Sequence, residues 1–441
     1  MNILTVNTLD KTGGASEIAS QLIRGYKEHG HQCEFVVGYQ FSNDSCSIKL
    51  DHLSYRNRCY RLLDNLVEMG SKLKIPKIRG IANQLLLPLT EPGRYNRVHE
   101  GFEDYNFPGT SRILNQLQSV PDIVHIHNLH GDYFDLRALP NISNQVPTFI
   151  TLHDAWLLSG HCAHSFDCER WKSGCGSCPD LNIPPSIKKD KTAENWALKK
   201  EVFANSSLYI ASPCQWMADK VMQSILKPAV KEIRVIPNGI DTDAFKPYPK
   251  SVARVRWGMS KDRVNILMRG PLGRKDPYWR DDETLIRSLE LLSTKNTCSN
   301  FDLYCYGGAK TDQTIGKLTI KSLGYFDSKE DMAEFLSATD LYIHASSADT
   351  YPNTVLEAMS CGVPVLASNV AGINEQIEPG RNGFLYTAGN AEALFKMIER
   401  CLKENVSLGP MGENAAAYVR RNNTLSHMTE AYLSWFEELL R

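Results

Sequence analysis

Two carboxylate side chains, Asp349 and Glu357, stand eight residues apart around the expected start of a helix. A loop containing Pro352 gives way near Asn353 to helix-favouring residues. The first backbone N–H groups of a helix have no partner within it, and the positive end of the helix dipole lies there. The sequence therefore predicts an anion site, with Asp349 in the loop and Glu357 one turn inside the helix.

Histidines mark the ends of two other expected strands. His125 and His127 belong to one apolar run, whose alternation sends both side chains to the same face. His153 and Asp154 follow the next run. Parallel sheets bind ligands at the carboxyl ends of their strands, so these residues are candidates for a binding site. A core or rim histidine with satisfied hydrogen bonds is the alternative at each position.

A glycine turn, Gly13 and Gly14, follows the first expected strand and opens a helix. Glycine permits the tight turn and the close backbone approach that a phosphate or a sugar requires. The turn lacks the complete GxGxxG dinucleotide fingerprint. A simple connection between strand and helix therefore stays open as the alternative.

Four cysteines lie within seventeen residues and end in a C-x-x-C pair: Cys162, Cys168, Cys175 and Cys178. This spacing is compatible with a small structural zinc site that folds an otherwise coreless loop, 161–179. A closed site of four thiolates has no open position for catalysis. Free thiols in a buried loop are the alternative, because the gap within the first pair is irregular.

Apolar strands alternate with helices along most of the chain, which predicts an α/β fold with parallel sheets covered on both faces. Because 441 residues exceed what one core usually holds, we expect two domains. A proline- and charge-rich stretch, 226–239, suggests the boundary. The expected parts are 1–228, 229–420 and a C-terminal helical segment, 421–441.

A segment at about 50–118 interrupts this alternation with helices that carry several basic residues: Lys72, Lys74, Lys77 and Arg79. A solvated helical insertion with an apolar underside is the favoured interpretation. A peripheral contact with a membrane surface is the alternative.

Bulk composition excludes several classes of protein. The formal net charge of -1 gives no global field that would gather nucleic acid, and 42% hydrophobic residues argue against disorder. The first residues lack the pattern of a signal peptide, and no apolar run reaches the roughly 18 residues of a membrane span. We therefore expect a cytoplasmic protein whose cysteines are thiols or metal ligands rather than disulfides.

The most informative stretch runs from Ala348 to Gly383. It contains ADTYPNTVLEAMSCGVPV at 348–365, NVAGINEQI at 369–377 and GRNGFL at 380–385. This stretch resembles the retaining glycosyltransferases of family 4, in which a Glu, seven residues and a second Glu flank the helix start. Here an aspartate, Asp349, takes the place of the first Glu and shortens that carboxylate by one methylene.

The resemblance covers most of the chain and implies the GT-B fold, in which two Rossmann-like domains face each other across a cleft. It also implies that the last helix packs back on the N-terminal domain. In the C-terminal domain, Asp349 would contact the donor sugar near its anomeric centre and Glu357 would hold the ribose. The backbone groups offered to the phosphates would be those of Asn353, Thr354 and Val355.

The family also places an Arg and a Lys on the donor diphosphate, after the first strand of the C-terminal domain. Arg269 and Lys275 match these positions, and Arg274 is the rival of Lys275. Fixed cations stabilise a leaving diphosphate more in the transition state than in the ground state. No divalent metal or other cofactor would then be required for catalysis.

On the N-terminal side, the resemblance places the loop of Gly13 and Gly14 across the cleft from the diphosphate and His127 beside the donor sugar. Asp154 would either fix the imidazole of His153 or help to bind the acceptor. The cysteine-rich loop is similar to one in family members of the capsule and O-antigen type, where it would shape the acceptor side.

The resemblance predicts a retaining transfer of a hexosyl unit from a UDP- or GDP-sugar to a glycan, free or lipid-linked, in surface polysaccharide biosynthesis. The enzyme would be cytoplasmic, with or without peripheral contact at the inner face of the membrane. Two other functions fit the same sequence. One is a nucleotide-sugar 2-epimerase of the same fold, and the other is a non-catalytic glycan- or nucleotide-binding protein, which the aspartate at 349 permits.

Overall fold

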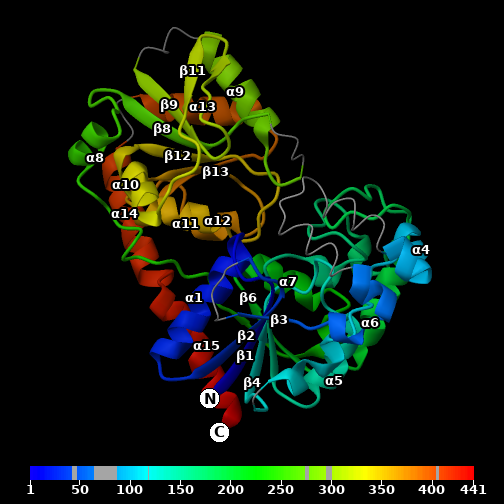
Figure 1. Ribbon diagram of the computed structural model, residues 1–441. Helices are drawn as coiled ribbons and strands as arrows, with labels where there is room; N and C mark the ends of the chain where they lie inside the picture. Colours follow the sequence, from blue (N-terminus) through cyan, green and yellow to red (C-terminus); the bar gives the residue numbers. More distant parts are fainter. Residues whose placement is uncertain (42–46, 64–86, 118, 274–277, 295–299, 404–406) are drawn as a thin grey trace. The chain divides into compact units, whose positions relative to one another are not determined.

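The computed structural model describes residues 1–41, 47–63, 87–117, 119–273, 278–294, 300–403 and 407–441 (Figure 1). These residues form two compact units, Met1–Ser212 with Met217–Val235 and Pro213–Trp216 with Ile236–Arg441. The chain thus divides after Val235, whereas the sequence predicts a division after 228. The reason is that a strand at Val230–Val235 pairs with the sheet of the first unit.

The first unit is built on a sheet of seven parallel strands in the order β3-β2-β1-β4-β5-β6-β7. Their bounds are β1 Asn2–Leu9, β2 Gln32–Tyr39, β3 Ser47–Lys49, β4 Ile123–Ile126, β5 Thr148–Thr151, β6 Leu208–Ser212 and β7 Val230–Val235. The chain order reverses between the neighbouring strands β1 and β4. The carboxyl ends of these two strands therefore form the switch point at which such sheets bind ligands.

Helices cover this sheet, and short 3-10 turns join them: α1 Gly14–Glu28, η1 Leu53–Tyr55, α4 Pro92–His99, η2 Thr110–Gln116, η3 Leu136–Ala138, α5 Leu139–Ser143, η4 Trp156–Leu158, η5 Arg170–Lys172, α6 Thr192–Ala204, α7 Gln215–Met222 and η6 Lys227–Ala229. Helix α1 buries Ala19 and Ile23 against Phe35 and Val37 of β2. The basic residues predicted at 72–79 lie outside the described residues.

The second unit has a sheet in the order β10-β11-β9-β8-β12-β13-β14, parallel except for the pair β10 and β11. Its strands are β8 Val264–Arg269, β9 Phe301–Tyr306, β10 Gln313–Ile315, β11 Leu318–Ser322, β12 Leu341–His344, β13 Val365–Ser368 and β14 Gly383–Tyr386. The order reverses between β8 and β12, so the switch point of this sheet lies at their carboxyl ends. The two sheets confirm the predicted α/β class.

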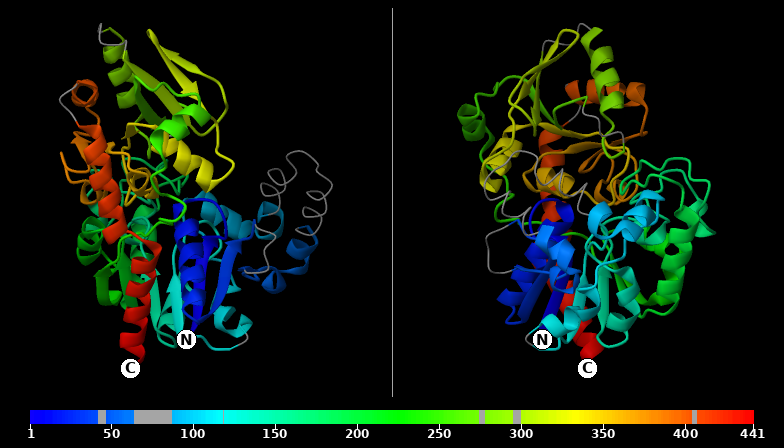
Figure 2. Two further views of the ribbon diagram at one scale, coloured as in Figure 1. Left: turned by 90° about the vertical axis from the view of Figure 1, so that its left-hand side faces the viewer. Right: turned by 45° about the vertical axis from the view of Figure 1, so that its right-hand side comes forward.

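The helices of the second unit are α8 Lys250–Arg256, α9 Asp282–Thr294, α10 Lys329–Ala338, α11 Asn353–Ser360, α12 Ile373–Gln376, α13 Ala391–Leu402, α14 Leu408–Asn422 and α15 Leu425–Leu440. Helices α9 and α13 lie together (Figure 1) and bury Leu289 and Ile398 against Leu303 and Leu366 of the sheet. Helix α14 packs beside α11 (Figure 2), which fixes the helix whose start is the predicted anion site. The packing of 421–441 on the first domain stays a prediction.

Among the helices of the described segments, none combines the length and the apolar character that crossing a membrane requires.

Candidate functional site

At the switch point of the second sheet, two of the predicted site residues line one pocket. Arg269 is the last residue of β8, and Asp349 lies in the loop that follows β12. Both side chains line this pocket together with Trp279, Arg280 and His344. The structure thus brings together a cation and a carboxylate that are eighty residues apart in sequence.

Asp349 terminates a chain of polar contacts that starts in the interior of the second unit. The hydroxyl groups of Tyr306 and Tyr342 are 3.3 Å apart, and the Tyr342 hydroxyl lies 3.3 Å from Nδ1 of His344. Nε2 of His344 lies 3.6 Å from the Asp349 carboxylate, which is too long for a hydrogen bond but within ion-pair distance. His344, which sequence reasoning did not single out, thus lies beside the carboxylate of Asp349 and lines the same pocket. Its position as the last residue of a buried strand is the signal that could have identified it.

Two predicted donor-binding residues of α11, Thr354 and Glu357, interact with the same tyrosines. Burial raises the pKa of Tyr342, and Glu357 adds to this increase, while Arg269 and a hydrogen bond from Thr354 oppose it. The pKa of Tyr306 is also raised, mainly by burial. Glu357 raises it further, and Arg269 lowers it. Arg269, Thr354 and Glu357 are therefore all within interaction range of one buried pair of phenols.

Helix α11 begins at Asn353, as the sequence predicts. The residue before it, Pro352, has no side-chain oxygen and caps no backbone N–H group of the helix. The side chain of Asn353 accepts a hydrogen bond from Asn238 at 3.1 Å, and Val355 is fully buried. Because no side chain of Pro352 occupies the helix start, its backbone N–H groups remain suited to an anion.

A second cation of this pocket, Arg280, was not predicted. Its guanidinium donates to the carbonyl oxygens of Arg269 at 2.7 Å and Gly270 at 3.2 Å, and it pairs with Asp282 at 2.8 Å. Arg280 therefore fixes the backbone that carries Arg269. The predicted partner Lys275, like its rival Arg274, lies outside the described residues.

In the first unit, the predicted histidines gather at the carboxyl ends of β4 and β5. The rings of His125 and His127 have centroids 4.5 Å apart, and Nδ1 of His127 lies 2.9 Å from Nε2 of His153. Nε2 of His127 is buried and has no hydrogen-bond partner. The Asp154 carboxylate contacts a different imidazole, that of His130, at 2.7 Å. The direct partner of Asp154 is thus His130, and the roles predicted for Asp154, toward His153 or toward the acceptor, stay predictions.

A buried lysine that was not predicted, Lys199, bonds to the loop that follows Asp154. Nζ of Lys199 donates to the carbonyl oxygens of Trp156 at 2.9 Å and Ser159 at 3.0 Å, and it pairs with Glu103 at 3.1 Å. Its side chain is 0% exposed. Asp154 in turn accepts from the backbone N–H of Trp156 at 2.9 Å, so Lys199 fixes the segment that orients Asp154.

Burial favours the neutral form of His125, His127 and His153. It lowers the pKa of His125 to about 3 and that of His153 to about 4, and it lowers the pKa of His127 well below its ordinary value. For His130, burial also acts to lower the pKa, but Asp154 outweighs it and the pKa is raised. His130 is thus the histidine of this cluster that favours the charged form.

Acidification is expected to destabilise the first unit. Unfolded histidines titrate near pH 6.5, above the folded values of His125 and His153, so the unfolded state binds protons first as the pH falls. Stability is complete above pH 6.5 and is lost progressively below it, by about 2 kcal/mol per histidine at pH 5. Urea unfolding between pH 7 and 5 measures this loss. The stability of His125→Phe should depend less on pH than that of the wild type. His29→Gln, which replaces an exposed histidine, is the control and should behave as the wild type does. If the stability of His125→Phe depended on pH as strongly as that of the wild type, His125 would not be a source of the loss.

The glycine turn lies at the switch point of the first sheet. Gly13 precedes α1 with a φ of 89°, a left-handed conformation that favours glycine, and Gly14 is the first residue of the helix. An added Cβ at either position would meet no atom within 4 Å. Space is therefore open at this turn for a ligand to approach the backbone, in agreement with the predicted role, which stays a prediction.

The four cysteines of the predicted zinc site, Cys162, Cys168, Cys175 and Cys178, line one pocket, beside His161, whose Nε2 lies 3.4 Å from Sγ of Cys178. Burial raises the pKa of three of these thiols: Cys162, Cys175 and Cys178. In the part of the chain that the structure describes, no group of three or more His, Cys, Asp or Glu side chains is arranged to hold a metal ion. Zinc at these thiols stays a prediction.

Two family models match the sequence. One, described as Glycosyltransferase Family 4, matches residues 12–244, and one described as Glycosyl transferases group 1 matches residues 267–404. A protein of Escherichia coli K12, whose name assigns it to colanic acid biosynthesis as the glycosyl transferase WcaC, is 26% identical over 452 aligned positions that cover 100% of both chains. A D-inositol 3-phosphate glycosyltransferase of Acidothermus cellulolyticus is 26% identical over 38% of this chain and 40% of its own.

Solved structures share the fold over the whole chain. Anabaena HepE in complex with UDP has a TM-score of 0.63 at 16% identity and covers 99% of this chain and 100% of its own. The sucrose-phosphate synthase of Thermosynechococcus elongatus has a TM-score of 0.63 at 16% identity. The match covers 100% of this chain and 99% of the synthase chain. These neighbours are GT-B glycosyltransferases, and the first family model spans more than half of the sequence. The chain belongs to glycosyltransferase family 4 and has the GT-B fold, which confirms the family and the fold predicted from its sequence.

Proposed function

We propose that this glycosyltransferase moves a hexosyl unit from a UDP- or GDP-sugar to a glycan acceptor, free or lipid-linked, in surface polysaccharide biosynthesis, with retention of configuration. The observation that carries the proposal is the pocket shared by Arg269 and Asp349 at the switch point of the second sheet. The name of WcaC supports the role in polysaccharide biosynthesis. The complexes of HepE with UDP and with UDP-glucose support a nucleotide-sugar donor.

The residues of this pocket suit the charge changes of the proposed reaction. As the bond between the anomeric carbon and the diphosphate breaks, negative charge grows on the leaving phosphate. Arg269 and the N–H groups at the start of α11 would stabilise that charge more in the transition state than in the ground state. Asp349 would hold the hydroxyl groups of the sugar, and Glu357 those of the ribose.

Retention is proposed to proceed by attack from the face that the diphosphate leaves. The acceptor hydroxyl oxygen forms the new bond to the anomeric carbon, the bond to the phosphate oxygen breaks, and that phosphate oxygen takes the hydroxyl proton. The protein then supplies orientation and electrostatic stabilisation and need not form a covalent intermediate. Such a reaction needs no protein carboxylate as nucleophile, in contrast to a double displacement.

Thermal denaturation in the presence of nucleotides tests the donor class. UDP or GDP at about 100 times its dissociation constant is expected to stabilise the protein by roughly 2.7 kcal/mol, with a corresponding rise in Tm. Arg269→Ala should reduce this shift. Arg287→Ala, which removes an exposed arginine of α9 that pairs with Glu283, is the matched control and should leave the shift unchanged. The donor assignment would be wrong if neither nucleotide shifts Tm, or if Arg269→Ala responds as the wild type does.

A further inference from the structure

The first unit contains a second pocket that none of the predicted site residues lines. It encloses about 430 Å³, within the roughly 300–1,000 Å³ typical of ligand sites. Helix α4, the segment 102–106 and helix α6 form its walls. Its lining includes three arginines, Arg94, Arg97 and Arg137, and two aromatic residues, Phe102 and Tyr105.

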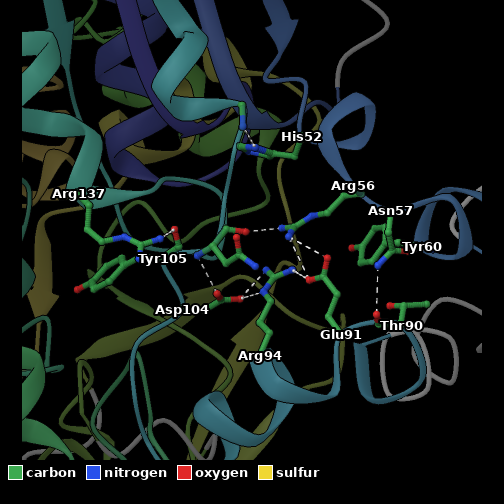
Figure 3. Close-up of polar contacts among 12 residues, drawn as sticks. His52, Arg56, Asn57, Tyr60, Thr90, Glu91, Arg94, Asp104, Tyr105 and Arg137 are labelled. Carbon is green, nitrogen blue, oxygen red and sulfur yellow. Dashed lines mark hydrogen bonds and ion pairs between the residues drawn. The ribbon is translucent and has the colours of Figure 1, made fainter.

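One wall of this pocket is fixed by a network of ion pairs, shown in Figure 3. Arg56 donates to both carboxylate oxygens of Glu91, at 3.0 and 3.1 Å, and Arg94 donates to Glu91 at 3.0 Å. Arg94 also bonds Asp104 at 2.6 Å. Two guanidinium groups and two carboxylates thus neutralise one another at this wall.

Every carboxylate that lines the pocket already has a cationic partner. Asp104 pairs with Arg94, Glu103 with Lys199 and Glu194 with Lys191.

Of the three lining arginines, Arg94 and Arg137 are paired, the latter with Asp135 at 2.8 Å. Arg97 forms no ion pair with any residue of the described segments, and its guanidinium lies over the Phe102 ring, 4.4 Å from the centroid. The pocket therefore carries one uncompensated positive charge, that of Arg97.

We infer that this pocket binds a negatively charged sugar unit of the acceptor glycan, one that bears a carboxylate or a phosphate. The inference rests on the proposed function and names the chemical class of its acceptor. Arg97 supplies a planar guanidinium that matches either anion with two parallel hydrogen bonds. Val98 and Leu198, both half-buried, add apolar surface to the lining against which a sugar ring can pack.

Contacts connect the pocket to the predicted acceptor-side residues of the same unit. Glu103 lines the pocket and accepts a hydrogen bond from the indole of Trp156 at 2.7 Å. The backbone N–H of Trp156 donates to Asp154 at 2.9 Å, and Asp154 pairs with His130. Glu103, which lines the pocket, is thus two contacts from Asp154, one of whose predicted roles is to bind the acceptor.

Calorimetric titration of the full-length protein tests the inference with defined probes. A hyaluronan tetrasaccharide presents two carboxylates, and its carboxyl-reduced form presents the same sugars without charge. The charged form is expected to bind at least tenfold more tightly than the reduced form, because a hydrogen bond to a charged group contributes about that factor. Glucose 1-phosphate against inorganic phosphate distinguishes a sugar phosphate from the free anion, and equal binding of the two would overturn sugar recognition.

Two arginine variants sharpen the test. Arg97→Ala should weaken binding of the charged tetrasaccharide roughly tenfold, and Arg97→Lys should recover part of it. Arg112→Ala is the matched control, because Arg112 also lies over an aromatic ring, that of Tyr55 at 5.1 Å, but does not line the pocket. Equal binding by Arg97→Ala and the wild type, or equal binding of the reduced probe, would overturn the inference. The Tm shift with UDP or GDP reports separately on the donor proposal, so either can fail alone.

Discussion

Replacing Asp349 with alanine is expected to lower the rate of sugar transfer by roughly 10²–10³-fold, because a preorganised polar group beside the reacting centre contributes on that scale. Binding of the nucleotide should persist, because Arg269 and the start of α11 are unchanged by the substitution. Initial rates of transfer and the Tm shift with nucleotide, measured on the same preparation, separate the two effects. A fall in rate with an intact shift supports a catalytic role for Asp349.

Two further variants control this experiment. Asp349→Glu restores the residue that the family resemblance places here, and it should retain activity within about tenfold if charge matters more than reach. Asp327→Ala removes an exposed carboxylate elsewhere in the second unit and should leave the rate unchanged. Transfer by Asp349→Ala at the wild-type rate would exclude the proposed role, and the non-catalytic alternative would then gain support.

The parallel strands that carry the site were predictable because their signal is local. Apolar runs ending in His127, Arg269 and His344 mark buried strands in a sheet covered on both faces. The start of α11 at Asn353 was predictable for the same reason, since proline and helix-favouring residues stand next to each other in sequence. The short hairpin of β10 and β11 was missed, because its first strand, Gln313–Ile315, has no apolar alternation.

Site residues that act by contacting other protein groups were not predicted. Arg280 donates to the backbone carbonyl of Arg269, which precedes it in the chain, and His344 lies near the carboxylate of Asp349 in the loop that follows its strand. Asp154 pairs with His130 rather than with the adjacent His153 because the ends of β4 and β5 lie side by side. Spacing in sequence identifies such residues as candidates, but the partner of each is set by packing between strands.

Replacing Lys199 with methionine is expected to lower the free energy of unfolding of the first unit by about 3–5 kcal/mol, because it leaves Glu103 as an uncompensated buried charge. The substitution also removes the donor to the carbonyl oxygens of Trp156 and Ser159. It also removes the cation–π contact between Nζ of Lys199 and the Trp156 ring, in which Nζ lies 3.8 Å from the ring centroid. Equilibrium unfolding in urea, followed by tryptophan fluorescence, measures the loss.

A double variant tests whether this loss comes from the unpaired charge of Glu103. Adding Glu103→Gln to Lys199→Met removes the unpaired charge while keeping an acceptor for the Trp156 indole, so the double variant should be more stable than Lys199→Met alone. Lys200→Met, at the exposed neighbouring position of α6, should cost less than about 0.5 kcal/mol. If Lys199→Met were as stable as Lys200→Met, the pair would not hold the Trp156 segment. The orientation of Asp154 would then depend on His130 and the Trp156 backbone alone.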